Sequence, residues 1–593
     1  MFRRTFAIAL LTAVFCCTLS VPRADEPPSD SLAKYLPAET FVYVEAPDLG
    51  ATWTRAGELA ITKFFSEGGL PQLICEKINA SFGAEENRRI DFAAIPKLLG
   101  EMTPRFASAF TGRAEFAWPS AMGDVPSVMI AFRVADGKDA EAKAIVEDIV
   151  KKLVDDIIGG GILTTERVEY KGAVLLGVPE AQLLDYEYCP WFCVTNGFAI
   201  VTYSRSSMNM ILEAFAAPPE DSLLARASFR KGYASVTAKD VRVFFSFGGL
   251  LCSSSVFRRD MGRSIGEENV TYFENADLTY GVTLNKMVAE DDLYVSLGDR
   301  QWPFPTDFFA ADSFCKGVSA SLFPSDTTAY ACANLDFAKI LKLMSAGDAK
   351  TDLNDLKAAG VDIEKDLIPL LGPEVSLGVI AKGSIPSGMI AVQLKDAAAG
   401  LAWFKNLAAV TKDAFADPVE YGGATLFPYR PEARAFLDLP SEMGRAAFAV
   451  KESWLLYGPM LTLKNALSSK AGALPKNPDF AAAVPTILTK QPQVLAFVNL
   501  RSIVRQYYPL LLTFFEREAP EGEEIAMALL APDRVEELAF PMVIGGTVTP
   551  DGGKLFSTSP FGIAPLLPPV SGFDYADLFS HPRHPVSNES AAM

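Results

Sequence analysis

One stretch of this chain is written twice, as PSVMIAFRVAD at residues 126–136 and as PSGMIAVQLKD at residues 386–396. Six of the 11 positions are identical. The middle of the first copy is a short run of β-branched and aromatic side chains, which is typical of a β-strand. The pair indicates that one structural unit occurs twice, because self-similarity on this scale is the mark of a repeated architecture.

Other blocks flank this pair in the same order in both parts of the chain. LPAETFVY at residues 36–43 corresponds to FPSDTTAY at 323–330, and VEYKGAVL at 168–175 corresponds to VEYGGATL at 419–426. Seven such blocks keep one order, with offsets that change only through insertions. An ordered series of this length predicts an internal duplication.

The block positions predict two similar units, at residues 33–300 and 320–565. Residues 301–319 are predicted to be a connector, since Pro303 and Pro305 would interrupt both helices and sheet ladders. Residues 566–593 are rich in proline, and we expect this tail to be mostly disordered.

The periodicities within each unit are mixed. Residues 128–134 are predicted to form a strand, and apolar side chains then recur at helical spacing from Ile145 to Ile157. Many short strands, joined by turns and separated by helices, favour an α+β fold in which each unit has a largely antiparallel sheet and packed helices. A doubly wound parallel sheet is the alternative.

Residues 1–24 have the pattern of an export signal. Arg3 and Arg4 precede an uncharged apolar run of 17 residues, and cleavage could follow Ser20 or Ala24. The run is shorter than the roughly 20 apolar residues of a membrane span, which disfavours an uncleaved anchor. The sequence therefore predicts an exported protein of the periplasm, the cell envelope or the extracellular space, with no transmembrane span beyond the signal.

The overall composition excludes two classes of protein. Of the 593 residues, 49% are hydrophobic and 21% are charged, which excludes an intrinsically disordered chain. Lys and Arg number 54 and Asp and Glu number 72, so the net charge is 54 − 72 = −18. An acidic chain of this kind is not expected to bind nucleic acid.

Histidine is nearly absent. The only two, His581 and His584, lie in the tail, so neither unit contains the imidazole that Ser-His-Asp or Cys-His catalysis and most zinc sites use. No phosphate-binding or dinucleotide-binding glycine motif is present. We therefore predict no catalytic, cofactor-binding or metal-binding residues, although the sequence alone does not exclude a pair of catalytic carboxylates.

Cys189 and Cys193 form a C-x₃-C pair, which is not the C-x-x-C motif of redox proteins. We expect a local disulfide or two paired buried thiols, because the corresponding segment before Phe448 has no cysteine and the shared fold does not need one. Six cysteines remain after residue 24, which allows disulfides in an exported chain, but mostly buried thiols are expected.

The opening Leu36–Thr40, LPAET, follows the export signal directly, and the second unit carries an Asp362-to-Gly372 block that ends in Leu-Leu-Gly. In these two features the chain resembles a family of exported bacterial proteins built on a domain of unknown function. The first unit departs from the second feature at residues 91–96. The resemblance implies an extracytoplasmic location and assigns no activity.

Together these observations predict an exported, non-enzymatic binding or interaction protein whose partner is an unknown protein or an apolar ligand. The 41 phenylalanines, with dense runs such as residues 244–247, support a first alternative, a carrier or sensor of lipid or another apolar ligand. A carboxylate-based hydrolase is the second alternative, and it requires two acids that converge in one open cleft. The oligomeric state is not predicted.

Overall fold

The computed structural model describes most of both predicted units. The predicted signal peptide at residues 1–24, most of the connector and the tail at 566–593 lie outside the described residues. The described ranges are 30–67, 105–119, 128–152, 165–178, 189–253, 273–296, 314–344, 360–381, 386–430, 445–468, 473–518, 529–549 and 552–562, with short pieces at 258–259, 262–263, 270, 298, 308–309, 354 and 357–358.

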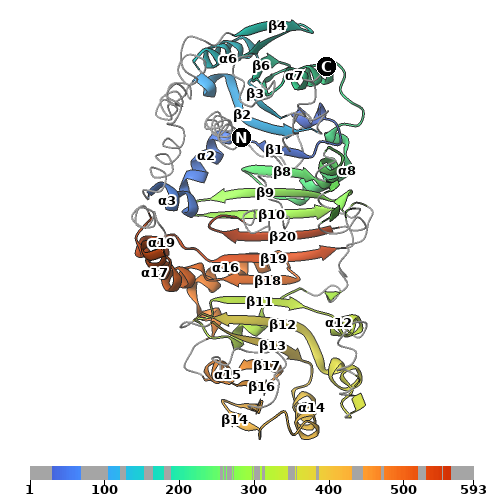
Figure 1. Cartoon of the computed structure of the whole chain (residues 1–593), viewed down its shortest axis with the longest axis vertical. Helices are drawn as coiled ribbons and strands as arrows, with labels where there is room; N and C mark the ends of the chain where they lie inside the picture. The colour runs from blue at the N-terminus through green and yellow to red at the C-terminus, as the bar shows by residue number, and fades with distance from the viewer. Residues whose placement is uncertain are drawn as a thin grey trace, which may run out of the picture.

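Twenty strands form a single sheet that runs the length of the molecule (Figure 1). Ten belong to the first part of the chain: β1 (Val42–Ala46), β2 (Phe110–Trp118), β3 (Met129–Val134), β4 (Glu166–Tyr170), β5 (Ala173–Gly177), β6 (Trp191–Thr195), β7 (Phe198–Thr202), β8 (Val241–Ser246), β9 (Asp277–Asn285) and β10 (Val288–Ser296). Ten belong to the second part: β11 (Ala329–Asn334), β12 (Leu371–Ile380), β13 (Ser387–Leu394), β14 (Val419–Tyr421), β15 (Ala424–Pro428), β16 (Ala446–Lys451), β17 (Trp454–Pro459), β18 (Val494–Val498), β19 (Met542–Thr549) and β20 (Gly552–Ser559).

The strand order has the same form in both parts. The first ten strands lie in the order β4-β5-β6-β7-β3-β2-β1-β8-β9-β10. The last ten lie in the order β14-β15-β16-β17-β13-β12-β11-β18-β19-β20. Every pair of described strands is antiparallel, so the predicted mixed fold with a large antiparallel sheet is confirmed and the parallel alternative is wrong.

The two parts meet at one seam, where β10 pairs with β20 over eight residues from Ala289↔Ser559 to Ser296↔Gly552. Side-chain contacts of Asp292, which we call the Asp292 clasp, also join the two parts at this seam. Asp292 accepts hydrogen bonds from the backbone and hydroxyl of Thr237, and its other oxygen lies 3.0 Å from the Lys490 ammonium. One continuous sheet, rather than a separate sheet for each unit, was not indicated by the sequence.

The helices lie on both faces of the sheet. They are α2 (Leu49–Glu58), α3 (Ala60–Glu67), α6 (Asp139–Lys152), α7 (Arg205–Ala216), α8 (Ala227–Ser235), α9 (Phe247–Ser253), α12 (Phe337–Met344), α14 (Ala397–Val410), α15 (Met460–Leu467), α16 (Pro478–Leu488), α17 (Leu500–Glu518) and α19 (Pro532–Leu538). Short turns of other helix types are η1 (Leu32–Lys34), η3 (Leu223–Ala225), η5 (Val318–Leu322), η6 (Ile363–Leu367), η7 (Ile368–Leu370) and η9 (Leu474–Lys476). Among the described residues, no helix is both long and apolar enough to cross a membrane.

One face of the sheet is covered in both parts by helices, α7 and α8 in the first and α15 and α16 in the second. Each part has a trio of packed aromatic rings under its helix, with centroid distances of 5.6 and 5.1 Å in the first and 5.8 and 5.0 Å in the second. The trios are Tyr43, Phe229 and Phe244 under α8, and Tyr330, Phe480 and Phe497 under α16.

The opposite face is covered mainly toward its two ends. Helix α6 packs on the strands at one end and α14 on the strands at the other. Nearer the middle, α2 and α3 cover one side of β9, where Leu59 packs against Val282 and Leu284. The remaining middle of this face is where the structure departs from an ordinary two-sided core.

Candidate functional site

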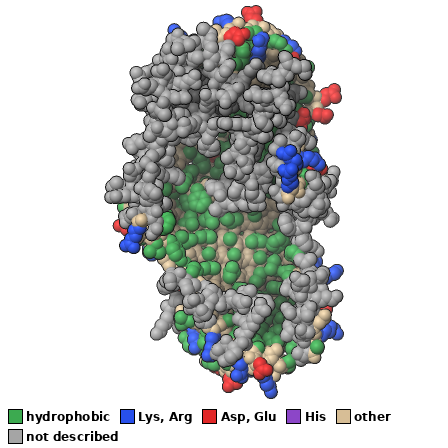
Figure 2. Space-filling model, in the orientation of Figure 1, with side chains coloured by type: hydrophobic (Ala, Val, Ile, Leu, Met, Phe, Trp, Pro, Cys, Tyr) green, Lys and Arg blue, Asp and Glu red, His purple; other side chains and the backbone are tan. Residues whose placement is uncertain are grey.

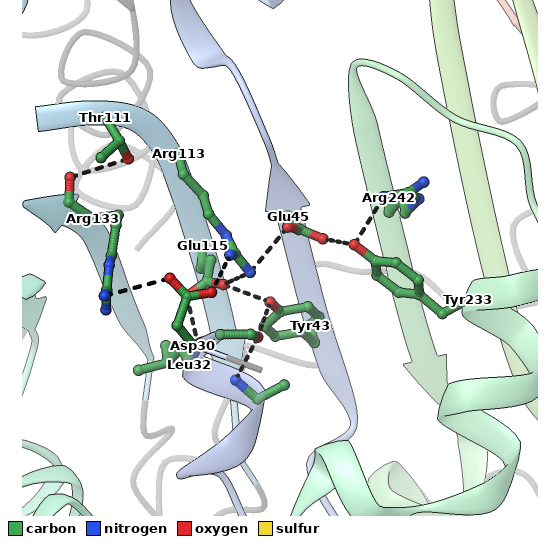
Figure 3. A network of polar contacts seen from close by, with 12 residues as sticks. Asp30, Leu32, Tyr43, Glu45, Thr111, Arg113, Glu115, Arg133, Tyr233 and Arg242 are labelled. Carbon is green, nitrogen blue, oxygen red and sulfur yellow. Dashed lines mark hydrogen bonds and ion pairs between the residues drawn. The ribbon is translucent and has the colours of Figure 1, made fainter. Parts of the chain in front are cut away.

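A buried cluster of charges joins β1, β2 and β8 (Figure 3). One Nη atom of Arg113 lies 2.6 Å from a carboxylate oxygen of Glu115 and 3.0 Å from one of Glu45. Both carboxylates are only 2% exposed. Burial raises the pKa of Glu115 and outweighs the lowering effect of the Arg113 charge.

Two tyrosines close this cluster. The hydroxyl of Tyr43 donates to Glu115 at 2.9 Å, and the hydroxyl of Tyr233, on α8, donates to Glu45. Burial, reinforced by the neighbouring carboxylates, raises the pKa of both tyrosines. Arg242 in turn donates to the Tyr233 hydroxyl at 2.9 Å. Glu45 is enclosed by Tyr233 of α8 and Glu115 by Tyr43 and the Leu32 backbone of η1, so these two buried carboxylates do not form the open cleft that a carboxylate hydrolase needs.

The second part keeps a single buried acid in the corresponding place, Glu374 on β12, which accepts a hydrogen bond from the Ser319 backbone as Glu115 does from that of Leu32. In the strand order, Glu45 on β1 pairs with Glu115 and Arg242 on its neighbours. The corresponding residue on β11, Cys332, pairs with Ser376 and Leu495. Since the second part builds the same strand order without the Arg113 contacts to two carboxylates, we interpret the cluster as a structural tie between strands and helix rather than as a reactive site.

The stronger candidate is a hollow on the opposite face of the sheet (Figure 2). It lies over the middle strands β8, β9, β10, β20, β19, β18, β11 and β12, and Figure 2 shows its surface to be apolar. Leu377 and Leu555 are 45% and 37% exposed there, unlike core leucines. We call this surface the apolar hollow.

Cross-strand register defines the floor of the apolar hollow. One row runs from Leu377 on β12 to Ala331, Ala496, Ile544 and Ser557 on successive strands. A parallel row places Leu555 beside Gly546 and Val494. Because alternate strand residues share a face, the large partners of these small residues, such as Tyr330 and Phe497, point into the covered core. In the second part the floor is therefore made mainly of small and aliphatic side chains, whereas the same face of β8 and β9 also carries Phe245 and Tyr280.

Polar groups are few on this floor. Among the described strand residues of this face, Asp291 is the only charged side chain, and it is buried. Tyr280 donates to it at 3.0 Å from the same face, and Ser557 donates to it across the seam. Burial and the Asp291 charge raise the pKa of Tyr280, so this hydroxyl keeps its proton.

An amphipathic helix lies beside the apolar hollow. Helix α17 begins directly after β18, and α19 leads into β19, so both lie where these two floor strands end (Figure 1). Helix α17 exposes Leu510 (63%), Leu511 (45%) and Phe514 (56%) along one side. Arg534 on α19 forms an ion pair with Glu67 on α3 at 2.8 Å, which connects the helices of the two parts.

The two cysteines singled out by the sequence lie elsewhere. Cys189 and Cys193 are buried in the core under α7, and the structure holds both as free thiols, with no disulfide between them. Burial raises the pKa of the Cys193 thiol to about 12 and also raises that of Cys189. They are far from acting as nucleophiles and take no part in the apolar hollow.

Sequence reasoning did not identify the floor residues. A usable signal exists in β11, where Ala329, Ala331 and Ala333 alternate with the larger Tyr330 and Cys332. A strand with large residues on one face and alanine on the other indicates that the second face is not filled by a packed helix. The signal is weak because every residue in the run is apolar or small, so neither face is marked as polar.

Comparison with known proteins adds no assignment. No family model matches the chain, and no curated protein matches it. Among solved structures, crystal form III of TP0453 is similar over 47% of this chain and 85% of that chain, at 14% identity and a TM-score of 0.25. Crystal form I is similar over 46% and 82%, at 11% identity and a TM-score of 0.24. Similarity at this level identifies neither a family nor a function.

Proposed function

We propose that this protein is an exported, non-enzymatic binding protein, and that it binds an apolar ligand in the apolar hollow. The observation that carries the proposal is the half-exposed middle of the sheet, where Asp291, the one charged side chain among the described strand residues of this face, is buried. Monomeric soluble proteins rarely expose large contiguous apolar surfaces, and those that exist mark binding sites. Leu377 and Leu555 are 45% and 37% exposed, so a ligand that covers each would regain about 0.6–1.3 kcal/mol, the exposed share of the roughly 1.5–3 kcal/mol for burying a whole leucine side chain.

We further propose that the chain is a tandem duplication and that the hollow depends on it. The ordered sequence blocks and the identical form of the two strand orders support this. The floor takes β8, β9 and β10 from one unit and β20, β19, β18, β11 and β12 from the other. On this proposal neither unit alone forms the complete binding surface.

Export is also part of the proposal. It is supported by the basic start and apolar run within residues 1–24 and by the resemblance to exported bacterial proteins. An apolar compound has low solubility outside the cell, and a protein that covers its surface would keep it dispersed. The periplasm, the cell envelope and the extracellular space all meet this description.

Titration of the purified mature protein with Nile red, a neutral dye that brightens in apolar surroundings, tests the proposal. We expect saturable binding that falls at least tenfold in A331E and in A496E, because each places a carboxylate on the floor. The matched control is A402E, at an exposed position of α14. Absence of saturable binding, or equal loss in A402E, would refute the proposal.

A further inference from the structure

We infer that the ligand of the apolar hollow is a lipid with a neutral or zwitterionic headgroup, whose acyl chains lie on the floor strands. This inference rests on the proposed function and names its ligand class. Four features support it: the hydrogen-bonded backbone of the sheet, the surface shape of the floor, the charge of the site and the helix beside it.

The backbone of the floor is not available to a peptide strand. All eight floor strands have a strand neighbour on both sides, so the peptide groups of the sheet interior are already hydrogen-bonded. An extended peptide binds a sheet by adding a strand at an open edge, and the hollow has none. Laid flat on the floor, it would desolvate its own amides without partners, at a cost of about 1–3 kcal/mol for each group. An acyl chain has no such groups.

The surface shape of the floor favours a thin ligand without side chains over a helical partner. Helical partners are anchored by large side chains that enter deep pockets. The floor on β11, β18 and β19 presents mainly alanine, glycine, valine and Ile544, as in the row through Ala331 and Ala496, and its large aromatic side chains are Phe245 and Tyr280 on β8 and β9. Seven strand spacings give a width of about 34 Å. One leaflet of a bilayer core is about 15 Å thick, so the floor has room for the chains of one diacyl lipid.

The charge of the site selects the headgroup. No Lys or Arg is present among the described strand residues of the floor, and the one acid, Asp291, is already occupied by Tyr280 and Ser557. Nothing on the floor can pair with a phosphate or a carboxylate. The chain also carries a net charge of −18, which repels anions at low ionic strength. The favoured headgroup is uncharged overall and remains in solvent.

Helix α17 indicates where such a ligand comes from. Its exposed Leu510, Leu511 and Phe514 form an apolar side next to the ends of the floor strands. A helix with one apolar side and a polar opposite side lies in the interfacial layer of a bilayer. Membrane contact at this helix would bring the hollow next to acyl chains, which a soluble peptide ligand would not require.

Lipid extraction from vesicles tests the inference. Mature protein is incubated with vesicles of dioleoylphosphatidylcholine, or of dioleoylphosphatidylglycerol, at low ionic strength, and the vesicles are removed by centrifugation. Native mass spectrometry then counts the lipid retained. We expect one phosphatidylcholine per protein, at least fivefold more than phosphatidylglycerol, a tenfold loss in A331E and A496E, and wild-type retention in A402E. Free phosphocholine should not compete.

The outcomes separate this inference from the proposed function. Nile red binding without retention of either lipid, and displacement of the dye by a Leu-Ala helical peptide, would overturn the lipid inference and leave the proposed function in place. Equal retention of the two lipids would overturn the headgroup assignment. Failure of both dye and lipid to bind would overturn the inference and the proposed function together.

Discussion

At the scale of single residues, the buried charge cluster shows how one fold tolerates two solutions. Glu45 and Glu115 lie where the second part has Cys332 and Ser376, and Arg113 lies where it has the buried Glu374. Removing one member of a buried ion pair leaves an uncompensated charge, whereas neutral replacements of the whole set are often tolerated. The cluster therefore contributes to stability only while it is complete.

Substitutions at Arg113 and Glu115 should have unequal effects. R113M leaves two buried carboxylates without their cation and should lower the free energy of unfolding by about 3–5 kcal/mol at pH 7. E115Q should cost less, about 1–2 kcal/mol, because the amide keeps one oxygen for Arg113 and Tyr43 and avoids the desolvation of a charge, but it loses the acceptor for the Leu32 backbone N–H. Urea unfolding at pH 7 measures both. Equal losses would contradict this account of the cluster.

The pH dependence of E115Q follows from the raised pKa of Glu115. A carboxyl group whose folded pKa lies above its unfolded value of about 4.3 favours the folded state most below that value. This contribution is lost as the pH rises through the folded pKa. E115Q lacks the titration, so its deficit relative to wild type should shrink between pH 4 and pH 7. A deficit that grows with pH would contradict the assignment.

The buried thiols give a second prediction at this scale. Cys189, Cys193, Cys315 and Cys332 are buried and free. Burial raises the pKa of Cys193 to about 12, so almost no thiolate exists at pH 8. We expect these four to be unreactive toward Ellman's reagent in the folded protein and reactive in guanidinium chloride. Peptide mapping that finds Cys189 and Cys193 joined as a disulfide would show the free-thiol assignment to be wrong.

At the scale of elements, the seam between β10 and β20 is the connection that the sequence did not reveal. The strand at residues 128–134 and the helix that follows it were predictable from local periodicity. β3 confirms the strand, and α6 confirms the helix as far as residue 152, while residues 153–157 of the predicted helix lie outside the described residues. Period-2 alternation identifies a strand and its faces but not its neighbour. β10 and β20 lie more than 250 residues apart in the sequence, so nothing local pairs them.

Asp292 should be essential to this seam. Burial alone would raise its pKa, but the Thr237 hydrogen bonds and the charges of Lys554 and Lys490 bring it below its ordinary value. D292A should therefore cost about 2–4 kcal/mol at pH 7, because Lys490 and Thr237 lose a buried partner. E290A, the exposed neighbour on β10, is the matched control and should change little.

The contribution of Asp292 to stability should change with pH in the opposite direction to that of Glu115. A carboxyl group with a lowered folded pKa stabilises the protein above its unfolded pKa of about 3.9, and the contribution disappears as the pH falls through the folded value. The difference between wild type and D292A should thus be full at pH 7 and smaller at pH 3. Denaturant unfolding at the two pH values measures it, and a constant difference would exclude an electrostatic clasp.

Helix α17 gives a prediction about rate rather than affinity. L510E places a charge on its exposed apolar side without touching the floor of the hollow. If this side meets the membrane, the variant should extract phosphatidylcholine from vesicles at least fivefold more slowly and bind Nile red with unchanged affinity. Stopped-flow transfer of a fluorescent phosphatidylcholine measures the rate. Slower extraction accompanied by weaker dye binding would instead indicate damage to the hollow.

At the scale of the whole molecule, the candidate site exists because the two parts of the chain contribute strands to one continuous sheet, joined where β10 pairs with β20. The sequence predicted an apolar ligand as an alternative from its composition, and it excluded histidine chemistry because His581 and His584 lie in the tail. It could not locate the hollow, since Leu377, Ala331 and Leu555 come together only through long-range pairing. The composition gives the total number of apolar side chains, whereas the strand topology determines which of them remain exposed.

The same join predicts how the second part behaves alone. All ten of its strands are contiguous within residues 314–562, so this fragment should fold and leave β20 as an open edge. In the strand order Phe556 corresponds to Asp292, which is also its partner across the seam. If β10 and β20 are copies of one strand, the β20 of a second fragment can take the place of β10. Two fragments should then pair through their β20 strands, with Phe556 of one opposite Phe556 of the other.

Light scattering should therefore report a dimer for the fragment. In that dimer residue 554 of one copy lies opposite residue 558 of the other, because positions equidistant from Phe556 face each other across an antiparallel pair. A fragment carrying K554C and T558C should form intermolecular disulfides on mild oxidation, whereas T558C alone should not. A folded monomer would mean that the seam depends on specific contacts such as the Asp292 clasp. That result would exclude the explanation that β10 and β20 pair because they are copies of one strand.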